Sequence, residues 1–276
     1  MSKMSVLFHQ KEHKYESVDL FEKINWVGVT TLVSKFKTPF NAKEVAIKSS
    51  QKKGSKWYGI SPATILKIWE AETLRSTTLG SWYHDGEEQY LLSRDSISIG
   101  EHKYVIQKPI FNSEGIKIAP DQKLLPGTIY PEHFCYLKTI GVCGQSDRVE
   151  VTPNNVLNIL DYKTNKEIEL KSFVNWEGRS KRMLPPLYHI DDSNFWHYAL
   201  QLSIYAYIIL KHNPQLKVGE LKIEHIIFEE AGRDEYDYPI TLLNEKGEPI
   251  VKDKVLYKLP YLKNEVELIL EHKKAA

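Results

Sequence analysis

Two adjacent apolar segments near the middle of the chain constrain its fold most strongly. Residues 134–151 (FCYLKTIGVCGQSDRVEV) alternate between apolar and polar side chains as a strand does, and residues 156–163 (VLNILDYK) form a second strand-like run. The turn-forming residues Pro153, Asn154 and Asn155 separate them. The sequence therefore predicts that the two runs pair as a hairpin.

A long apolar helix is predicted to follow this hairpin. Residues 194–212 (NFWHYALQLSIYAYIILKH) are largely apolar and end before Pro214. The preceding residues Asp191, Asp192 and Ser193 are all good N-caps. A helix this apolar is expected to pack against the sheet that the hairpin begins.

Four further elements complete the predicted order. They are a helix capped by Thr30 or Thr31 that stops at Pro39, a helix over 79–92 that begins near Gly80, a strand over 221–230, and an amphipathic helix in the last dozen residues. This order of helix, strands, long helix and strand predicts an α/β or α+β core with helical additions at the N-terminus.

Charge and composition narrow the classes of function. The 276 residues suffice for one or two domains, and 37 Lys+Arg against 36 Asp+Glu give a net charge of +1. Whole-chain charge therefore indicates neither a nucleic-acid nor a membrane partner. The first residues (MSKMSVLFHQKEHKYE) lack the apolar run of a secretion signal, and no long apolar stretch occurs. We expect an intracellular protein that is neither secreted nor membrane-spanning.

One segment is much more basic than the chain as a whole. Residues 35–75 hold nine lysines and arginines against three glutamates, a net charge of +6. One interpretation is a solvated helical surface.

The cysteines Cys135 and Cys143 are too few for a disulfide framework or a four-cysteine metal site, so a reducing environment fits best.

Two short patterns contain residues suited to metal binding. In Gly80-Ser81-x-x-His84-x-x-x-Glu88, the imidazole and the carboxylate are four residues apart and share one face of a helix. They could reach one ion or one water, or form an ordinary surface pair. The second pattern ends in Asp147, an acid within an apolar strand, which needs a partner or a metal if it is buried and otherwise marks a turn or an edge.

Two more patterns place polar groups among apolar ones. Asp161 and Lys163 flank Tyr162 at the end of a strand, so their side chains point to one face and Tyr162 to the other. A salt-bridged strand end would look the same. Gln201 and Tyr205 share one face of the long apolar helix, where the amide needs a polar partner and the tyrosine could be a core aromatic.

In chain order, the patterns G-S-x-x-H-x-x-x-E, G-x-S-D, D-Y-K and Q-L-x-x-Y span residues 80–205. Together they resemble the motifs of RecB-like exonucleases in the PD-(D/E)XK nuclease superfamily. A further similarity, to the phage and mitochondrial genome maintenance exonucleases, lies in Val29–Leu32 (VTTL) and residues 182–207. Some members bind an iron–sulfur cluster through four cysteines, and none is expected here.

The resemblance implies an α/β fold with a restriction-endonuclease-like core, a mixed central sheet flanked by helices, and a helical N-terminal elaboration. It implies one nuclease domain over residues 1–276. Within it, residues 1–79 would form the basic elaboration, residues 80–230 the catalytic core and residues 231–276 a strand and helix extension.

The resemblance also assigns roles to residues. His84, Asp147, Asp161 and the Tyr162 carbonyl would bind Mg²⁺, with Mn²⁺ as a substitute. The catalytic groups would be Lys163, Glu88 and the two aspartates. DNA would contact Gln201 and Tyr205, the lysines Lys52, Lys53 and Lys56 interleaved with aromatic rings, and a loop carrying Trp176, Arg179, Lys181 and Arg182.

The function that this resemblance implies is metal-dependent hydrolysis of DNA at its ends, during replication, recombination or repair of phage or mobile-element DNA. The substrate would be DNA with a free end, with single-stranded DNA as one candidate form. The location would be the cytoplasm of a bacterial host if the chain is phage-encoded. The alternatives are an endonuclease that is structure-specific or restriction-like, and a catalytically silent DNA-binding protein of the same fold.

Overall fold

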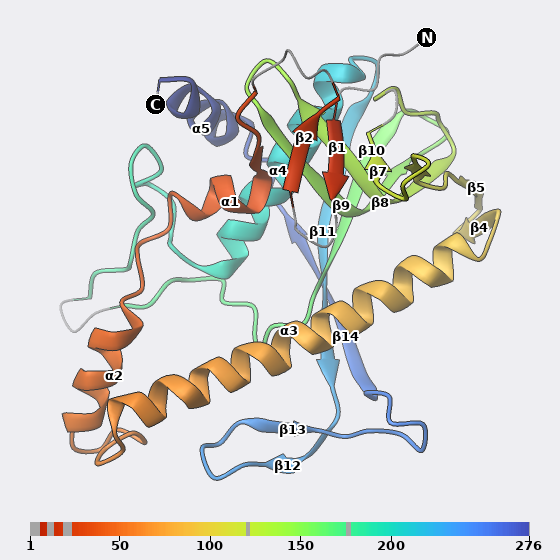
Figure 1. Cartoon of the computed structure of the whole chain (residues 1–276). Helices are drawn as coiled ribbons and strands as arrows, with labels where there is room; N and C mark the ends of the chain where they lie inside the picture. Colours follow the sequence, from red (N-terminus) through yellow and green to blue (C-terminus); the bar gives the residue numbers. More distant parts are fainter. Residues whose placement is uncertain (1–5, 10–13, 19–23, 120–121, 175–177, 276) are drawn as a thin grey trace.

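A computed structural model describes residues 6–9, 14–18, 24–119, 122–174 and 178–275. A mixed eight-stranded sheet forms its centre (Figure 1). The strand order is β14 (Val251–Leu259), β11 (Lys217–Phe228), β10 (Val156–Lys163), β9 (Val142–Val151), β8 (Thr128–Leu137), β5 (His102–Ile106) and β4 (Ser96–Ile99), with β3 (Val27–Gly28) beside β9. The β10–β11, β5–β8 and β3–β9 pairs are parallel and the others antiparallel.

Two smaller sheets accompany the central one. The first has the order β2 (Lys14–Ser17), β1 (Val6–His9), β7 (Lys117–Ile118) and β6 (Ile110–Phe111). The second pairs β12 (Glu230–Arg233) with β13 (Pro239–Thr241) and forms an arm below the core in Figure 1. The helices are α1 (Val29–Ser34), α2 (Ala42–Gln51), α3 (Pro62–Leu92), α4 (Asn194–His212) and α5 (Lys263–Ala275). The α/β class with helices flanking a mixed sheet is therefore confirmed.

The predicted hairpin is present, but its first run is two strands. Strands β9 and β10 pair antiparallel around the predicted turn, where Asn155 has a φ of 60°. Residues 134–137 instead belong to β8, because the chain reverses through Lys138–Gly141, with Gly141 at a φ of 66°. An alternating pattern cannot distinguish one strand from two joined by a tight turn.

The helix over residues 79–92 extends much further towards the N-terminus than predicted. It begins at Pro62, where the Ser61 hydroxyl accepts a hydrogen bond of 3.1 Å from the Thr64 amide. Ser followed by Pro is a strong start signal that the prediction missed. Gly80 instead lies within α3, where a Cβ atom would be 3.1 Å from the Thr164 hydroxyl.

The terminal regions are continuous with the core: α3 runs through residues 79 and 80, β14 pairs with β11, and α5 packs against the main hydrophobic cluster. Gly28 precedes α1, so Thr30 and Thr31 lie within that helix and do not cap it.

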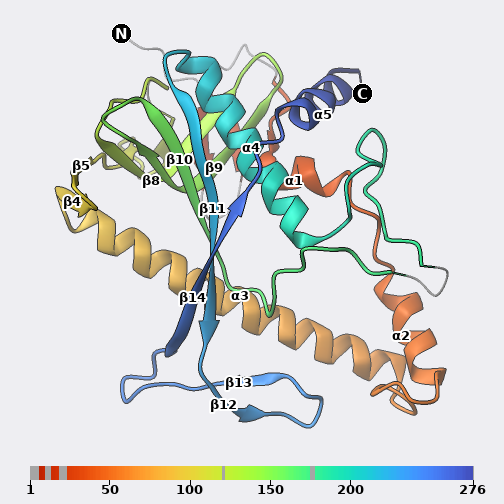
Figure 2. The ribbon, with the colours of Figure 1, turned by 180° about the vertical axis from the view of Figure 1, so that it is seen from behind.

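Helices α3 and α4 lie on opposite faces of the sheet (Figures 1 and 2). Leu157 and Ile159 of β10 join the core cluster that contains α4, whose start at Ser193 agrees with the prediction. On the other face, the Tyr162 ring packs edge-on against Tyr83 of α3, with ring centroids 5.4 Å apart. No helix among the described residues is both long enough and apolar enough to cross a membrane.

Candidate metal centre

Strands β9 and β10 separate at Asp147. Their ladder runs as far as the pair Arg148 and Leu160. Beyond it, the Tyr162 amide donates to Asp147 Oδ2 over 2.8 Å. A side chain therefore replaces the backbone partner, and the Asp147 carboxylate is fixed where the strands diverge.

His84 reaches this point from α3. Its Nδ1 lies 3.3 Å from Asp147 Oδ2, and its Nε2 lies 3.1 Å from the Tyr162 carbonyl oxygen. With Nε2–H donating to the carbonyl, Nδ1 faces Asp147 and donates to it, and it would become the ligand atom on losing its proton to a metal, with Nε2 held as in the usual arrangement of a histidine ligand. The Tyr162 carbonyl, which the resemblance implied as a ligand, is thus placed to orient His84.

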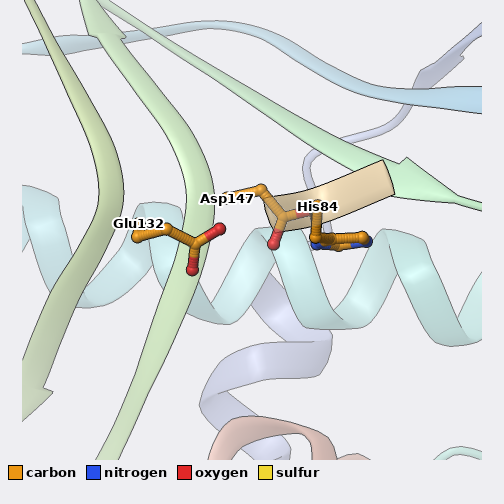
Figure 3. Close-up of side chains that lie close together, drawn as sticks. All are labelled: His84, Glu132 and Asp147. Atoms are coloured by element: carbon orange, nitrogen blue, oxygen red, sulfur yellow. Dashed lines mark ion pairs between the residues drawn. The ribbon is translucent and has the colours of Figure 1, made fainter. Parts of the chain in front are cut away.

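Glu132 is a site residue that sequence reasoning missed. It lies on β8 between Pro131 and His133, whose registered partners on β9 are Arg148 and Ser146, so Glu132 faces Asp147 across the strand pair. Figure 3 shows Asp147 between Glu132 and His84. One ligand atom from each of the three side chains lies within 4.8 Å of the other two.

The backbone at Glu132 is irregular. Tyr130 and Cys135 both face the main core, although side chains five residues apart on a regular strand point to opposite faces. Glu132, with a φ of 47°, lies between them. Strand β8 therefore changes face at Glu132, a feature that no alternating pattern predicts.

Asp161 and Lys163 share a face, as predicted, and their charges act on both Asp147 and His84. They form an ion pair. Asp161 Oδ1 accepts from Gln201 Nε2 over 3.4 Å, and the Lys163 ammonium lies 4.8 Å from the centre of the Tyr198 ring. Among the described residues, Asp161 is not in the group of mutually close ligand atoms, because Lys163 and Gln201 hold it beside that group.

Burial and repulsion between neighbouring carboxylates raise the pKa of two of these groups, Glu132 and Asp161. Burial, followed by the Asp147 charge, raises the pKa of Glu132 to about 8 and that of Asp161 to about 6. Burial also opposes ionisation of Asp147, but its hydrogen bond to His84 outweighs this effect and lowers its pKa. The same contact outweighs the burial of His84 and raises the pKa of its imidazole to about 9.

Lys117 of β7 and Gln145 of β9 hold Glu132 in place. The buried Lys117 ammonium donates to the Glu132 carbonyl over 2.7 Å and to Gln145 Oε1 over 2.8 Å. The Gln145 amide in turn donates to the Glu132 carboxylate. Glu88, one turn beyond His84, acts electrostatically on both Lys117 and Glu132. Glu88 is therefore beside the centre, at its Glu132 end.

Gln201 and Tyr205 lie behind Asp161. Both are buried, Tyr205 with only 2% of its surface exposed. A Cβ atom on Gly144 would lie 2.8 Å from the Tyr205 ring, so the glycine of the G-x-S-D pattern makes room for the tyrosine. Tyr205 therefore has no exposed surface for DNA, contrary to its expected role, and supports Gln201 and the acidic residues.

The basic N-terminal segment is remote from the centre. Lys52 and Lys53 follow α2 and are exposed, and α2 lies beside the N-terminal end of α3 in Figure 1. From Pro62 to His84, α3 alone spans about 33 Å. Lys56 donates to the Tyr236 carbonyl over 2.8 Å, and Trp57 is buried in the same cluster, so its ring is not exposed for base stacking.

The basic loop is tied to the start of α4. Lys181 pairs with Asp192 at 3.2 Å, and Arg182 pairs with Asp191 at 2.9 Å. Arg179 is exposed. Trp176 lies outside the described residues, so its expected DNA contact has no structural counterpart here.

The donor set fits a hard divalent cation. Two carboxylates facing each other across a strand pair repel, and an ion between them removes that repulsion. Carboxylate oxygens suit Mg²⁺, and one imidazole also admits Mn²⁺. His84, Glu132 and Asp147 would hold the ion.

Comparisons with known proteins add little. No family model matches the chain, and no curated protein matches it. Among solved structures, the crystal structure of SSO0001 aligns with a TM-score of 0.31 and 11% sequence identity, over 96% of this chain and 80% of that one. A likeness this weak supports no inference about fold family or function.

Proposed function

We propose that this chain is a metal-dependent deoxyribonuclease with a PD-(D/E)XK-type catalytic core. The observation that carries the proposal is the arrangement around Asp147. Asp147 lies between Glu132 and His84 in a potential metal group, and the ion pair of Asp161 with Lys163 is close enough for its charges to act on Asp147 and His84. A bound cation and a fixed positive charge near the scissile phosphate both accelerate phosphodiester hydrolysis.

Each residue has a role in this mechanism. When bound, Mg²⁺ would polarise a phosphoryl oxygen and lower the pKa of a bound water. The Lys163 ammonium stabilises the negative charge that develops on the phosphoryl oxygens. Asp161 and the Tyr198 ring hold that ammonium in place, and Gln201 holds Asp161.

A polar groove beside His84 supports binding of a nucleic-acid strand. Its volume is about 450 Å³. Hydroxyl and amide side chains line it: Ser76, Thr77, Ser81, Thr164 and Asn165. Such groups commonly contact phosphates and sugars without reading sequence. We infer that the strand approaches the centre along this groove.

The substrate we propose is DNA with a free end, cut exonucleolytically. The test uses end-labelled single strands, linear duplex and covalently closed circles, each with Mg²⁺, Mn²⁺ or chelator. We expect cleavage of linear DNA, sparing of the circle, and loss of cleavage on chelation. Cutting of the circle would make the enzyme an endonuclease.

The matched variants separate a catalytic role from a general charge effect. Lys163→Ala should abolish cleavage, whereas Lys103→Ala, at an exposed position of β5, removes the same charge and should retain full activity. DNA binding without cleavage of any substrate by the wild type would favour the silent binding protein instead.

A further inference from the structure

A second cavity adjoins the candidate metal centre. It has a volume of about 220 Å³ and lies between the β6–β7 sheet and strand β8. Lys117 and Glu132 line it and also belong to the surroundings of the metal centre. A molecule in this cavity would therefore lie beside the group of His84, Glu132 and Asp147.

The walls combine apolar surface with a few polar groups. Ile110, Ile118 and Phe134 supply apolar surface, and Lys117 and His133 supply polar atoms. This combination is typical of a small-molecule site. A cavity of about 150 Å³ holds a benzene ring, so this one has room for a heterocycle.

His133 gives the cavity an unmet hydrogen bond. The side chain is 6% exposed, and in the described part of the chain its Nε2 has no hydrogen-bond partner. Buried ring nitrogens are normally paired, so this one is an unexplained polar atom at the cavity wall, covered by protein atoms here, and a shift of the ring would bring it to a ligand.

Lys117 gives the cavity positive charge. It uses two of its three N–H donors on the Glu132 carbonyl and Gln145. Lys108 and Lys123 also line the cavity. A ligand with one planar heterocycle and one anionic group matches this set of side chains.

We propose that this cavity binds the terminal nucleotide of the DNA strand, with its base against His133 and the apolar walls and its phosphate near Lys117. The proposal rests on the proposed nuclease function, because it is the nearby centre that identifies the ligand as part of a DNA end. A free nucleoside monophosphate has the same chemistry and is the other source of such a ligand.

The test compares two matched variants. Ile110→Trp fills the cavity from a position that is 46% exposed, and Ile240→Trp adds the same bulk at a 49% exposed position on β13. Calorimetry with deoxyadenosine 5′-monophosphate in EDTA measures binding without catalysis. We expect at least tenfold weaker binding for Ile110→Trp and unchanged binding for Ile240→Trp. No binding by the wild type, or equal binding by both variants, overturns the proposal.

A cleavage assay then separates the two sources of ligand and the two proposals. Substrates carry either a normal or an abasic terminal residue. Slower cleavage of the abasic end by the wild type, and not by Ile110→Trp, supports binding of the strand end. Equal rates overturn that assignment. Nucleotide binding by a wild type that cuts no DNA would contradict the nuclease function and leave the nucleotide site standing.

Discussion

Glu132 faces Asp147 across the β8–β9 strand pair, and both carboxylates lie within 4.8 Å of an imidazole nitrogen of His84. Like charges directly opposite on paired strands are destabilising. The arrangement is stable where a cation lies between them, and each carboxylate is also held by hydrogen bonds, Asp147 by the Tyr162 amide and Glu132 by Gln145. The pair is thus the observation on which the proposed metal centre rests most directly.

Glu132→Gln should weaken Mn²⁺ binding at least tenfold, because the amide keeps the size of the side chain and removes an anionic ligand. Calorimetric titration with Mn²⁺ measures the change. Glu101→Gln, at an exposed position, is the matched control and should bind as the wild type does. Unchanged affinity in Glu132→Gln would remove Glu132 from the centre.

Stability in EDTA should fall as the pH drops from 6.5 towards 4. The unfolded chain protonates His133 near its ordinary pKa of 6.5, while burial keeps the folded ring neutral down to about 3. The unfolded state then binds one more proton, which costs about 1.4 kcal/mol per pH unit. Urea denaturation of wild type and His133→Phe between pH 6.5 and 4.5 tests this, and equal pH slopes would contradict it.

Gly144→Ala should destabilise the protein by about 1–3 kcal/mol, because the added methyl group overlaps the Tyr205 ring in a packed core. Gly86→Ala is the informative contrast. Gly86 is exposed on α3 and an added Cβ atom there has no neighbour within 4 Å beyond its own turn of helix, so helix propensity should stabilise the protein by about 1 kcal/mol. Thermal melting of both variants measures the difference, and equal melting temperatures would contradict the packing argument.

Lys52→Ala with Lys53→Ala should weaken binding of long single strands if a strand follows α3 to its far end. Loss of two phosphate contacts should reduce the slope of log affinity against log salt by about 1.4. A strand of four nucleotides should show no effect, because α3 separates these lysines from His84 by about 33 Å. The double variant Lys103→Ala and Lys246→Ala removes the same charge elsewhere. A slope equal to that of the wild type would exclude Lys52 and Lys53 from the DNA path.

The sequence predicted the local features of the site well. A strand period of two residues placed Asp161 and Lys163 on one face, and the ion pair between them agrees. The helix containing His84 and the strand containing Asp147 were both recognised, and the shared motif order led to the expectation that they meet. The apolar run over residues 194–212 predicted α4 with its correct bounds.

The missed features depend on long-range packing. Glu132 follows Pro131 in a segment that carries no strand pattern of its own, and only its register with β9 brings it to Asp147. The burial of Tyr205 depends on the absence of a side chain at Gly144, 61 positions earlier in the chain. Neither relationship has a local sequence signal.

The most direct test of the metal-centre account is a paired measurement on Asp147→Asn and the wild type. Mn²⁺ binding and cleavage of end-labelled single-stranded DNA are measured on the same samples over a Mn²⁺ titration. The account predicts that wild-type cleavage rises with Mn²⁺ occupancy and that the variant loses both properties. Wild-type cleavage at full rate in chelator, or retained cleavage by a variant that binds no Mn²⁺, would contradict it.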